Sequence, residues 1–412
     1  MSKVREKLKE EWIRVKLADI SQIKRGASPR PIGDPRYFSD KGRGWIRISD
    51  VSKSYKYLKR TKQYLSELGE ERSVKVDRGD LIMSICATVG KPIMIKIPAC
   101  IHDGFVLFDK LHKKKVDTEF LFYALLNSEN TFLGSGQTGS QKNLNTTIVG
   151  NTEILLPPIY KQKIIAEILS KVDEDIEKTC EVIKKSEKIK KGLMRELFTK
   201  GIGHKKLKKT KLGMIPEEWE VLSLGEMGIF SKGKGISKKE LIPTGLPAIR
   251  YGEIYTKHNF IIKKFYSFIS KKTASESISI KKGDILFTGS GETPEEIGKS
   301  VAYLGDEKAY AGGDIIIFSP SKGNSLFLSY LFNSPLVRND LTKLGQGNSV
   351  VHMYKGLLEK IKVAIPNIDE QNNIAGIISK IDEKIDGYKK TKSKLETLKK
   401  GLMQDLLSAK NL

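Results

Sequence analysis

Cysteine is scarce in this 412-residue chain, which contains only Cys86, Cys100 and Cys180. No two of them have the spacing of a metal-binding pair, so we expect neither a disulfide framework nor a cysteine-based zinc site. A reducing cytoplasm fits this composition best. Long apolar runs are also missing, since no stretch approaches the roughly 20 residues of a membrane span. The start, MSKVREKLKEEW, is too charged for a signal peptide. The sequence therefore predicts a soluble cytoplasmic protein that does not contact a membrane.

Motifs of catalysis are equally scarce. The five histidines have no metal-ligand spacing, and the nearby carboxylates form no pair that recurs along the sequence. A DNA methyltransferase would need a glycine-rich cofactor loop and an Asn-Pro-Pro-aromatic motif, and the run LPPI at Leu156 lacks the polar first residue. The run IGKS at Ile297 resembles part of a phosphate-binding loop, but Thr293 stands where that motif requires glycine. We therefore predict no cofactor, no metal and no catalysis by the chain itself.

Positive charge is what the chain has in excess. It carries 73 Lys and Arg residues against 49 Asp and Glu residues, a net charge of +24, and its isoelectric point is near 9.6. This balance favours a polyanionic partner, of which nucleic acid is the commonest. Many basic proteins bind no nucleic acid, so charge alone leaves both interpretations open.

The sequence is internally duplicated. The segment LPPIYKQKIIAEILSKVDEDI, from Leu156, aligns without a gap with IPNIDEQNNIAGIISKIDEKI, from Ile365, 209 positions further on. Upstream the match is looser: EWIRVKL at Glu11 aligns with EWEVLSL at Glu218, and Gly26 with Gly233, at an offset that drifts as loop insertions would cause. Pairs in strict register are Gln162 and Gln371, Ser170 and Ser379, Asp173 and Asp382, and the KKGLM runs at Lys190 and Lys399.

Each copy ends in a predicted long helix. Apolar residues recur three and four apart after Pro157 and again after Pro366. A helix over 160–200 would extend about 60 Å, too long for one small domain. Its apolar stripe needs a cover, which is either the second copy in an antiparallel, coiled-coil-like pair or another protein. The second stripe is diluted by Lys392 and Lys399. The predicted helix-pair core consists of Ile165, Leu169, Val172, Ile176, Ile183, Leu193 and Leu197, with Ile374, Ile378, Ile381, Ile385, Leu395, Leu402 and Leu406.

Short strand-like runs between the helices, such as DLIMSI and DIIIFS, are separated by glycine-rich turns and predict α+β globular parts. The expected architecture is two globular α+β domains and two long antiparallel helices, related by a pseudo-twofold internal duplication. The predicted boundaries are 1–156 for the first globular domain, 157–200 for the first long helix, 201–217 for a basic linker, 218–364 for the second globular domain and 365–412 for the second long helix.

These features resemble the specificity subunits of type I restriction-modification systems. Members of that family have two target-recognition domains alternating with two helical segments, each opening on a Pro-Pro-Leu-x-Glu-Gln-x-x-Ile-Ala-like signature. Here it reads PPIYKQKIIA and PNIDEQNNIA, each followed by Ser-Lys, an apolar residue and Asp, and later by KKGLM. GMIPEEWEVLSL also resembles the family's start of a recognition domain, and the match covers essentially the whole chain.

The resemblance implies a subunit that reads DNA and has no catalysis of its own. It would bind double-stranded DNA, dock two methyltransferase subunits and, through them, restriction subunits. Each recognition domain would read one part of a bipartite, asymmetric target, with the helix pair as spacer and docking surface. The alternative is a helical scaffold protein that binds DNA without sequence specificity.

Both globular domains contain the residue types that such a function needs. Lys and Arg neutralise phosphates, while amides, hydroxyls and guanidinium groups can read base edges. Arg47 and Arg250 occupy equivalent places, each directly after an isoleucine. The predicted DNA-binding residues of the first domain are Lys24, Arg25, Ser28, Arg30, Arg43, Arg47, Lys53, Gln137, Lys142 and Asn143. Those of the second are Lys232, Lys234, Lys238, Lys239, Arg250, Tyr251, Lys257, His258, Gln346, Asn348, Ser349 and His352.

Overall fold

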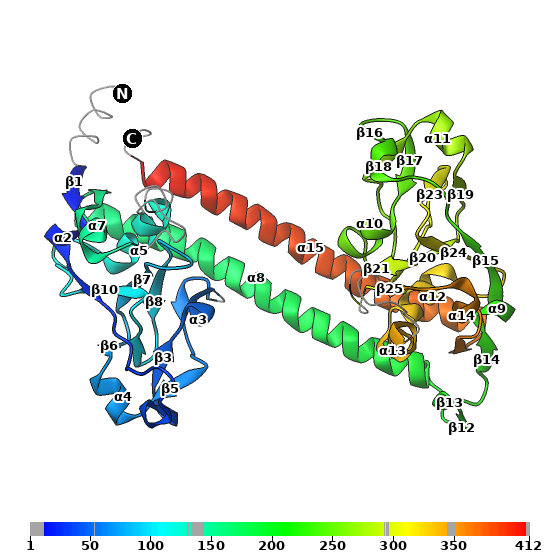
Figure 1. The fold of residues 1–412 in the computed structure, drawn as a ribbon, viewed down its shortest axis with the longest axis horizontal. Coiled ribbons are helices and arrows are strands. Elements are labelled where there is room, and N and C mark those ends of the chain that lie inside the picture. Colours follow the sequence, from blue (N-terminus) through cyan, green and yellow to red (C-terminus); the bar gives the residue numbers. More distant parts are fainter. Residues whose placement is uncertain are drawn as a thin grey trace. The chain divides into compact units, whose positions relative to one another are not determined.

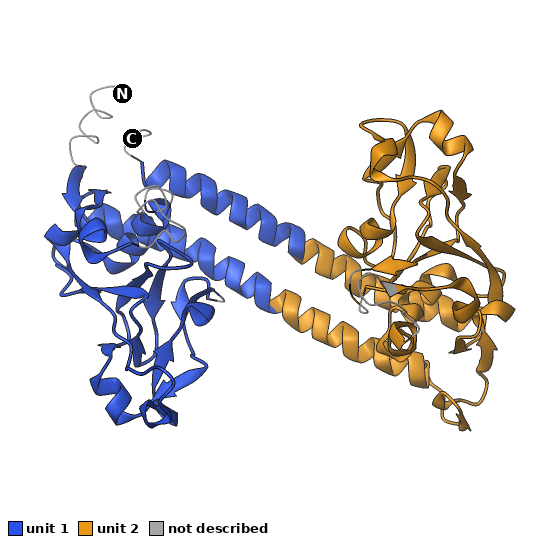
Figure 2. Ribbon diagram, in the orientation of Figure 1, with its two compact units in different colours: residues 1–181, 389–412 blue, residues 182–388 orange. Residues whose placement is uncertain are grey.

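The chain forms two compact units, one of residues 1–181 and 389–412 and the other of residues 182–388 (Figure 2). Each contains one α+β domain with parts of two long helices, α8 (Ile159–Lys200) and α15 (Ile368–Leu406) (Figure 1). Both helices therefore contribute to both units. None of the helices in the described part of the chain has the length and apolar composition of a membrane span. The structure, a computed structural model, describes residues 12–52, 54–129, 132, 144–291, 293, 296–343 and 351–408.

The domain of the first unit is built on two mixed sheets. Their strand orders are β2-β10-β7-β8-β4 and β5-β3-β9-β6, with β3 and β9 parallel, and a separate ladder pairs β1 with β11. The strands are β1 (Ile13–Lys16), β2 (Gln22–Arg25), β3 (Phe38–Ile46), β4 (Tyr57–Leu58), β5 (Gln63–Leu65), β6 (Val74–Val76), β7 (Leu81–Ser84), β8 (Pro92–Ile95), β9 (Ala99–Ile101), β10 (Phe105–Asp109) and β11 (Glu153–Leu156). The helices are α2 (Leu17–Ile20), η1 (Pro35–Tyr37), α3 (Ile48–Ser52), α4 (Glu67–Glu71), α5 (Thr118–Asn127) and α7 (Thr146–Asn151).

The domain of the second unit repeats this topology. Its sheets have the orders β15-β24-β20-β22 and β16-β18-β17-β23-β19, in which β17 and β23 are parallel as β3 and β9 are. The first domain's other parallel pair, β4 with β8, has no counterpart among these named strands. The ladder of β14 with β26 matches that of β1 with β11. The strands are β14 (Glu220–Ser223), β15 (Gly228–Lys232), β16 (Leu241–Ile242), β17 (Leu246–Ile249), β18 (Ser267–Ile269), β19 (Ile278–Ile280), β20 (Ile285–Thr288), β21 (Ser290–Gly291), β22 (Ser300–Ala302), β23 (Ala309–Ala311), β24 (Ile315–Pro320), β25 (Val351–His352) and β26 (Lys362–Ile365). The helices are α9 (Leu224–Met227), η2 (Lys238–Glu240), α10 (Tyr251–Thr256), α11 (Lys271–Ser275), α12 (Ser325–Phe332), α13 (Pro335–Lys343) and α14 (Lys355–Leu358).

The basic segment predicted to be a linker contains a β-hairpin of β12 (Leu207–Thr210) and β13 (Gly213–Pro216). The Glu370 carboxylate anchors its base: it accepts from the Ile202 backbone at 2.8 Å and from the Trp219 indole at 3.2 Å. The predicted domain boundaries themselves remain a prediction.

The glutamine of the repeated signature fixes the start of each long helix. Gln162 is fully buried; its amide donates to the Pro157 carbonyl at 2.7 Å and accepts from the Asp117 backbone at 2.8 Å. Gln371 does the same with the Pro366 carbonyl and the Asn324 backbone. Because buried amides need partners on both atoms, this side chain ties each helix start to the segment before α5 or α12.

The apolar stripes are covered in part by the globular domains. Every predicted stripe residue is buried or half-buried. Ile165 and Leu169 belong to the first domain's core, against which Leu402 and Leu406 also pack. In the second unit the core of the globular domain takes in Leu197, Ile374 and Ile378, with Leu193 packed against it. The ends of the stripes therefore pack into the domains as well as facing the other helix.

One sequence interpretation was wrong: Lys399 does not dilute the stripe. It is only 7% exposed, and its ammonium lies 2.8 Å from an Asp173 carboxylate oxygen that is also buried. In the second unit Lys190 contacts Asp382 at 2.5 Å in the same way. Going along α8 from Asp173 to Lys190, the ion-pair partner on α15 changes from Lys399 to Asp382, which is earlier in the sequence. The two helices are therefore antiparallel. The KKGLM lysine of each copy thus pairs with the repeated aspartate of the other.

Candidate nucleic-acid interface

A glycine starts the first polar loop of each domain. A Cβ on Gly26 would lie 2.2 Å from the His102 carbonyl oxygen, and one on Gly233 would lie 2.0 Å from the Gly312 carbonyl oxygen. In both domains the glycine N–H donates to the following strand, β10 or β24, at 2.9 Å. Only glycine allows so close a backbone approach, so the first loop of each domain lies against the turn that follows β9 or β23.

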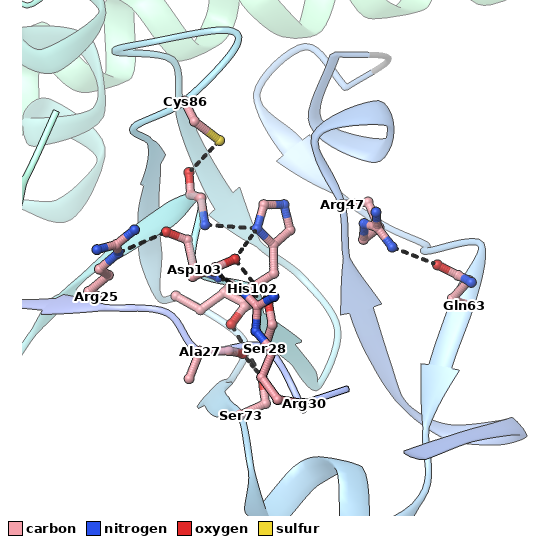
Figure 3. Close-up of polar contacts among 12 residues, drawn as sticks. Arg25, Ala27, Ser28, Arg30, Arg47, Gln63, Ser73, Cys86, His102 and Asp103 are labelled. Carbon is pink, nitrogen blue, oxygen red and sulfur yellow. Dashed lines mark hydrogen bonds and ion pairs between the residues drawn. The ribbon is translucent and has the colours of Figure 1, made fainter. Parts of the chain in front are cut away.

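Asp103, in that turn, gathers the polar side chains of the first domain's loop (Figure 3). Its carboxylate accepts from Ser28 and Arg30, each at 2.9 Å, and its backbone carbonyl accepts from Arg25 at 3.0 Å. Burial acts to raise the pKa of Asp103, but the Ser28 hydrogen bond and nearby positive charge outweigh it and keep that pKa below its ordinary value. The charged carboxylate therefore holds Ser28 and Arg30, and the backbone carbonyl of the same residue holds Arg25, with the Arg30 side chain 68% exposed.

Arg47 stacks on Trp45, whose ring in turn lies beside that of His102, the residue before Asp103. Its guanidinium is 4.5 Å from the centre of the Trp45 ring. The Trp45 and His102 rings are arranged edge to face, with their centres 6.4 Å apart. A long hydrogen bond of 3.5 Å joins Arg47 to Gln63 (Figure 3). Stacking on a buried aromatic ring limits the rotamers of the arginine and leaves most of its donors available.

Two predicted residues of the first domain lie apart from this group. Arg43 is half-buried and donates to the Val76 carbonyl at 3.1 Å and to Asp77 at 2.8 Å, so its donors serve the domain itself. Lys24 is exposed on the edge strand β2. The predictions at Lys53, Gln137, Lys142, Asn143, Gln346, Asn348 and Ser349 lie outside the described residues.

In the second domain two cavities border the exposed Asp314, in the turn after β23. One, of about 350 Å³, is lined by Lys238, Arg250 and Tyr251. The other, of about 420 Å³, is lined by Lys232 and His352, among others. The structure thus brings five predicted residues, from the loop that holds Lys232 and Lys238, from Arg250 and Tyr251, and from His352, into two cavities that share Asp314.

Lys234 and Lys239 are exposed on the same loop. Lys257 and His258 are not part of this surface: they line a third cavity, of about 430 Å³, together with Asp382 of α15. His258 is 6% exposed, its ring lies against Tyr266, and burial lowers its pKa to about 4. We therefore leave Arg43, Lys257 and His258 out of the candidate interface.

Comparison with known proteins decides the family. The model of the type I restriction modification DNA specificity domain matches the chain twice, over residues 9–185 and 216–397. The chain belongs to this family. It is a specificity subunit of a type I restriction-modification system with two target-recognition domains, rather than a scaffold without DNA specificity.

Curated relatives and solved structures agree with this assignment. The type I restriction enzyme MjaVIII specificity subunit of Methanocaldococcus jannaschii is 28% identical, in an alignment that covers 97% of this chain and 93% of the relative. The putative MjaX specificity subunit of the same organism is 29% identical, in an alignment that covers 78% of this chain and 73% of the relative. The crystal structure of a type I S subunit from M. genitalium has a TM-score of 0.62 at 16% identity, covering 96% of both chains. A subunit from a study of type I complex assembly has a TM-score of 0.56 at 16% identity, covering 98% of both. At these identities the solved structures show the fold alone.

Several residues at the candidate interface of this specificity subunit were not singled out by the sequence interpretation. They are the two turn aspartates, Asp103 and Asp314, the stacking Trp45, and Tyr354 and Lys355 of the second cavity. The only sequence signal for the aspartates was their position beside glycine between two apolar strands. Among the described residues, no three His, Cys, Asp or Glu side chains gather so as to hold a metal ion.

Proposed function

We propose that the two recognition domains read different halves of a split DNA target, and that the chain itself performs no catalysis. The observation that carries this proposal is the difference between two surfaces at equivalent places of one topology. Around the turn after β9 or β23, the first domain has Ser28 and Arg30 on the Asp103 carboxylate and Arg25 on the Asp103 backbone carbonyl. The second domain instead has lysines and His352 in the cavities that border the exposed Asp314. Different donors and acceptors select different base edges.

In this proposal Arg47 and Arg250 are base readers, and the exposed lysines contact phosphates. Both arginines are half-buried and directly precede a short helix, α3 or α10, at equivalent places. A guanidinium whose stem is held by the domain loses less entropy when it binds guanine.

The proposed split target is tested by selecting binders from random DNA with the purified complex of this chain and its methyltransferase. We expect two short specified blocks separated by a gap of unselected bases, with an affinity that falls as salt rises. Affinity that depends on salt without any selected bases would support the scaffold alternative and reject the proposal.

The partners we propose are two methyltransferase subunits, one for each unit, and restriction subunits bound through them. Exposed apolar side chains recur on both long helices at positions 209 apart, the offset of the repeat. Exposed apolar side chains that gather on one surface often mark a protein interface. Ile168 and Ile377 are 40% and 38% exposed, and Ile189 and Leu398 are 63% and 51% exposed. Ile168 and Leu398 belong to the first unit, and Ile377 and Ile189 belong to the second.

Replacing Ile168 and Leu398 with glutamate is expected to reduce the methyltransferase content from two subunits per chain to one, because burying two carboxylates without partners costs several kcal/mol. Native mass spectrometry of the complex measures this number. The matched control is Lys171→Glu with Lys394→Glu, at exposed positions on the same helices. A glutamate variant that still binds two subunits would reject this docking surface.

A further inference from the structure

A Gly-Lys pair occurs at equivalent places in both domains, including the run IGKS whose resemblance to a phosphate loop led to no function. Lys91 lies directly before β8 and Lys299 directly before β22, and the glycine before each has a positive φ of +83° or +66°. The backbone carbonyl of each lysine accepts from the end of the preceding strand, at Ser84 or Thr288, at 3.0 Å. The two lysines therefore occupy equivalent positions, each directly before the second strand of equivalent hairpins, β7–β8 and β20–β22.

Both lysine side chains reach the carboxyl end of a short helix. Lys91 donates to the backbone carbonyls of Val51 at 2.9 Å and Ser54 at 3.0 Å, at the end of α3. Lys299 donates to the carbonyl of His258 at 2.7 Å, just beyond α10, and more weakly to Tyr255. Carbonyls at a helix end have no partner within the helix, so an ammonium group satisfies them and complements the helix dipole. Each ammonium is thereby engaged by carbonyls and is not held ready for a phosphate.

The amino end of each short helix directly follows an arginine that we propose reads bases, Arg47 before α3 and Arg250 before α10. The Arg47 backbone N–H donates to Asp50 at 3.0 Å, and the Arg250 backbone N–H donates to Glu253 at 3.1 Å. Helices of five and six residues contain few hydrogen bonds of their own, so contacts at their ends decide whether they keep their geometry. In both domains the carboxylate holds the arginine end and the lysine holds the far end.

We infer that Lys91 and Lys299 are positioning residues for DNA recognition, each holding the short helix that aims Arg47 or Arg250 at its half of the target. Neither lysine is proposed to contact DNA itself. The inference rests on the proposed function of the two arginines. It also explains why the Gly-Lys pair recurs although the loops around it differ.

The test uses Lys91→Met and Lys299→Met in the full chain, assembled with its methyltransferase, and measures base selectivity in each block of the target. Lys91→Met should reduce discrimination about ten-fold in one block, the order of one lost hydrogen bond to a charged group, and leave the other block unchanged. Lys299→Met should do the reverse. Lys91→Arg, which keeps a cationic donor, should restore most of the selectivity, and the exposed Lys113→Met serves as control.

A lysine that merely stabilises the domain would lower binding to every sequence alike, so an equal fall in both blocks would overturn the inference. Arg47→Ala and Arg250→Ala are measured in parallel. If they leave both blocks intact, the proposed function fails; if they relax their blocks while the lysine variants do not, only the positioning inference fails. Should Lys91→Met not assemble, Asp50→Asn weakens the other end of α3, and a loss not confined to the Arg47 block would contradict the inference.

Discussion

Replacing Asp173 with alanine is expected to lower the free energy of unfolding by about 3–5 kcal/mol, the usual cost of leaving one partner of a buried ion pair alone. Lys399 would lose its counter-ion while 7% exposed, and Tyr123 would lose a hydrogen bond of 2.6 Å to the same carboxylate. Burial, and next the charge of Asp173, raise the pKa of Tyr123, so this phenol remains a donor throughout the usable pH range. Urea unfolding of the full chain, followed by helical circular dichroism, measures the loss.

Two variants separate the ion pair from a general effect of substitution. Glu174→Ala, at the next position, breaks only exposed pairs with lysines and should cost under about 1 kcal/mol. Asp173→Leu combined with Lys399→Met should recover most of the stability, since an apolar pair carries no desolvation cost. A loss below 1 kcal/mol for Asp173→Ala would show that the buried pair is not what holds α15 to this unit.

The equivalent aspartate in the second unit should matter less. Asp382 pairs with Lys190 and accepts from Tyr330 at 2.9 Å, but its side chain is 24% exposed, so water can replace part of what is lost. Lys190 also lies 3.8 Å from the centre of the Phe260 ring, a contact that survives removal of the aspartate. We therefore expect Asp382→Ala to destabilise the chain in the same assay by less than Asp173→Ala does.

Arg47→Ala and Arg250→Ala are expected to weaken binding of the assembled complex to its own target by about 1–3 kcal/mol, or roughly 5–150-fold, the worth of one guanidinium pairing with a base edge. Binding to unrelated DNA should change little, because that affinity comes from phosphate contacts spread over many lysines. Competition between target and scrambled duplexes at one salt concentration measures both quantities.

Arg14→Ala is the matched control for these arginines. Its side chain is 75% exposed on β1 and lies 4.0 Å from Glu153, outside the candidate interface. It should leave the ratio of target to scrambled affinity unchanged. If Arg47→Ala or Arg250→Ala weakened target and scrambled DNA equally, and lowered the salt dependence by about one charge, that arginine would be a phosphate contact instead.

Local patterns predicted the long helices well and the domains only partly. The period of α8 and α15 follows from apolar residues three and four apart, which is a property of neighbouring positions. The parallel pairing of β3 with β9 joins segments more than 50 positions apart, and no local pattern specifies it. Lys399 was misread for a related reason: a charge on an apolar stripe looks like an interruption until its partner on another helix, Asp173, is located.

At the candidate interface, too, some residues could be predicted from local sequence and others could not. Gly26 and Gly233 were matched from sequence, and the structure gives their cause in a backbone approach that excludes any Cβ. The arginines were predicted from residue type and equivalent position. Asp103 and Asp314 were not, because a carboxylate in a glycine-rich turn is ordinary on a protein surface, and its importance comes from the loops that other strands bring to it.

In the proposed function, two domains of one topology read two separate blocks of one target. Single-base methylation profiling of genomic DNA measures both blocks at once, in cells whose complete complex carries the unchanged chain, Arg47→Ala or Arg250→Ala. We expect the unchanged chain to direct methylation to a split target, and each variant to relax bases in a different block while the other block is kept. A single contiguous target, or relaxation of the same block by both variants, would contradict the proposed function.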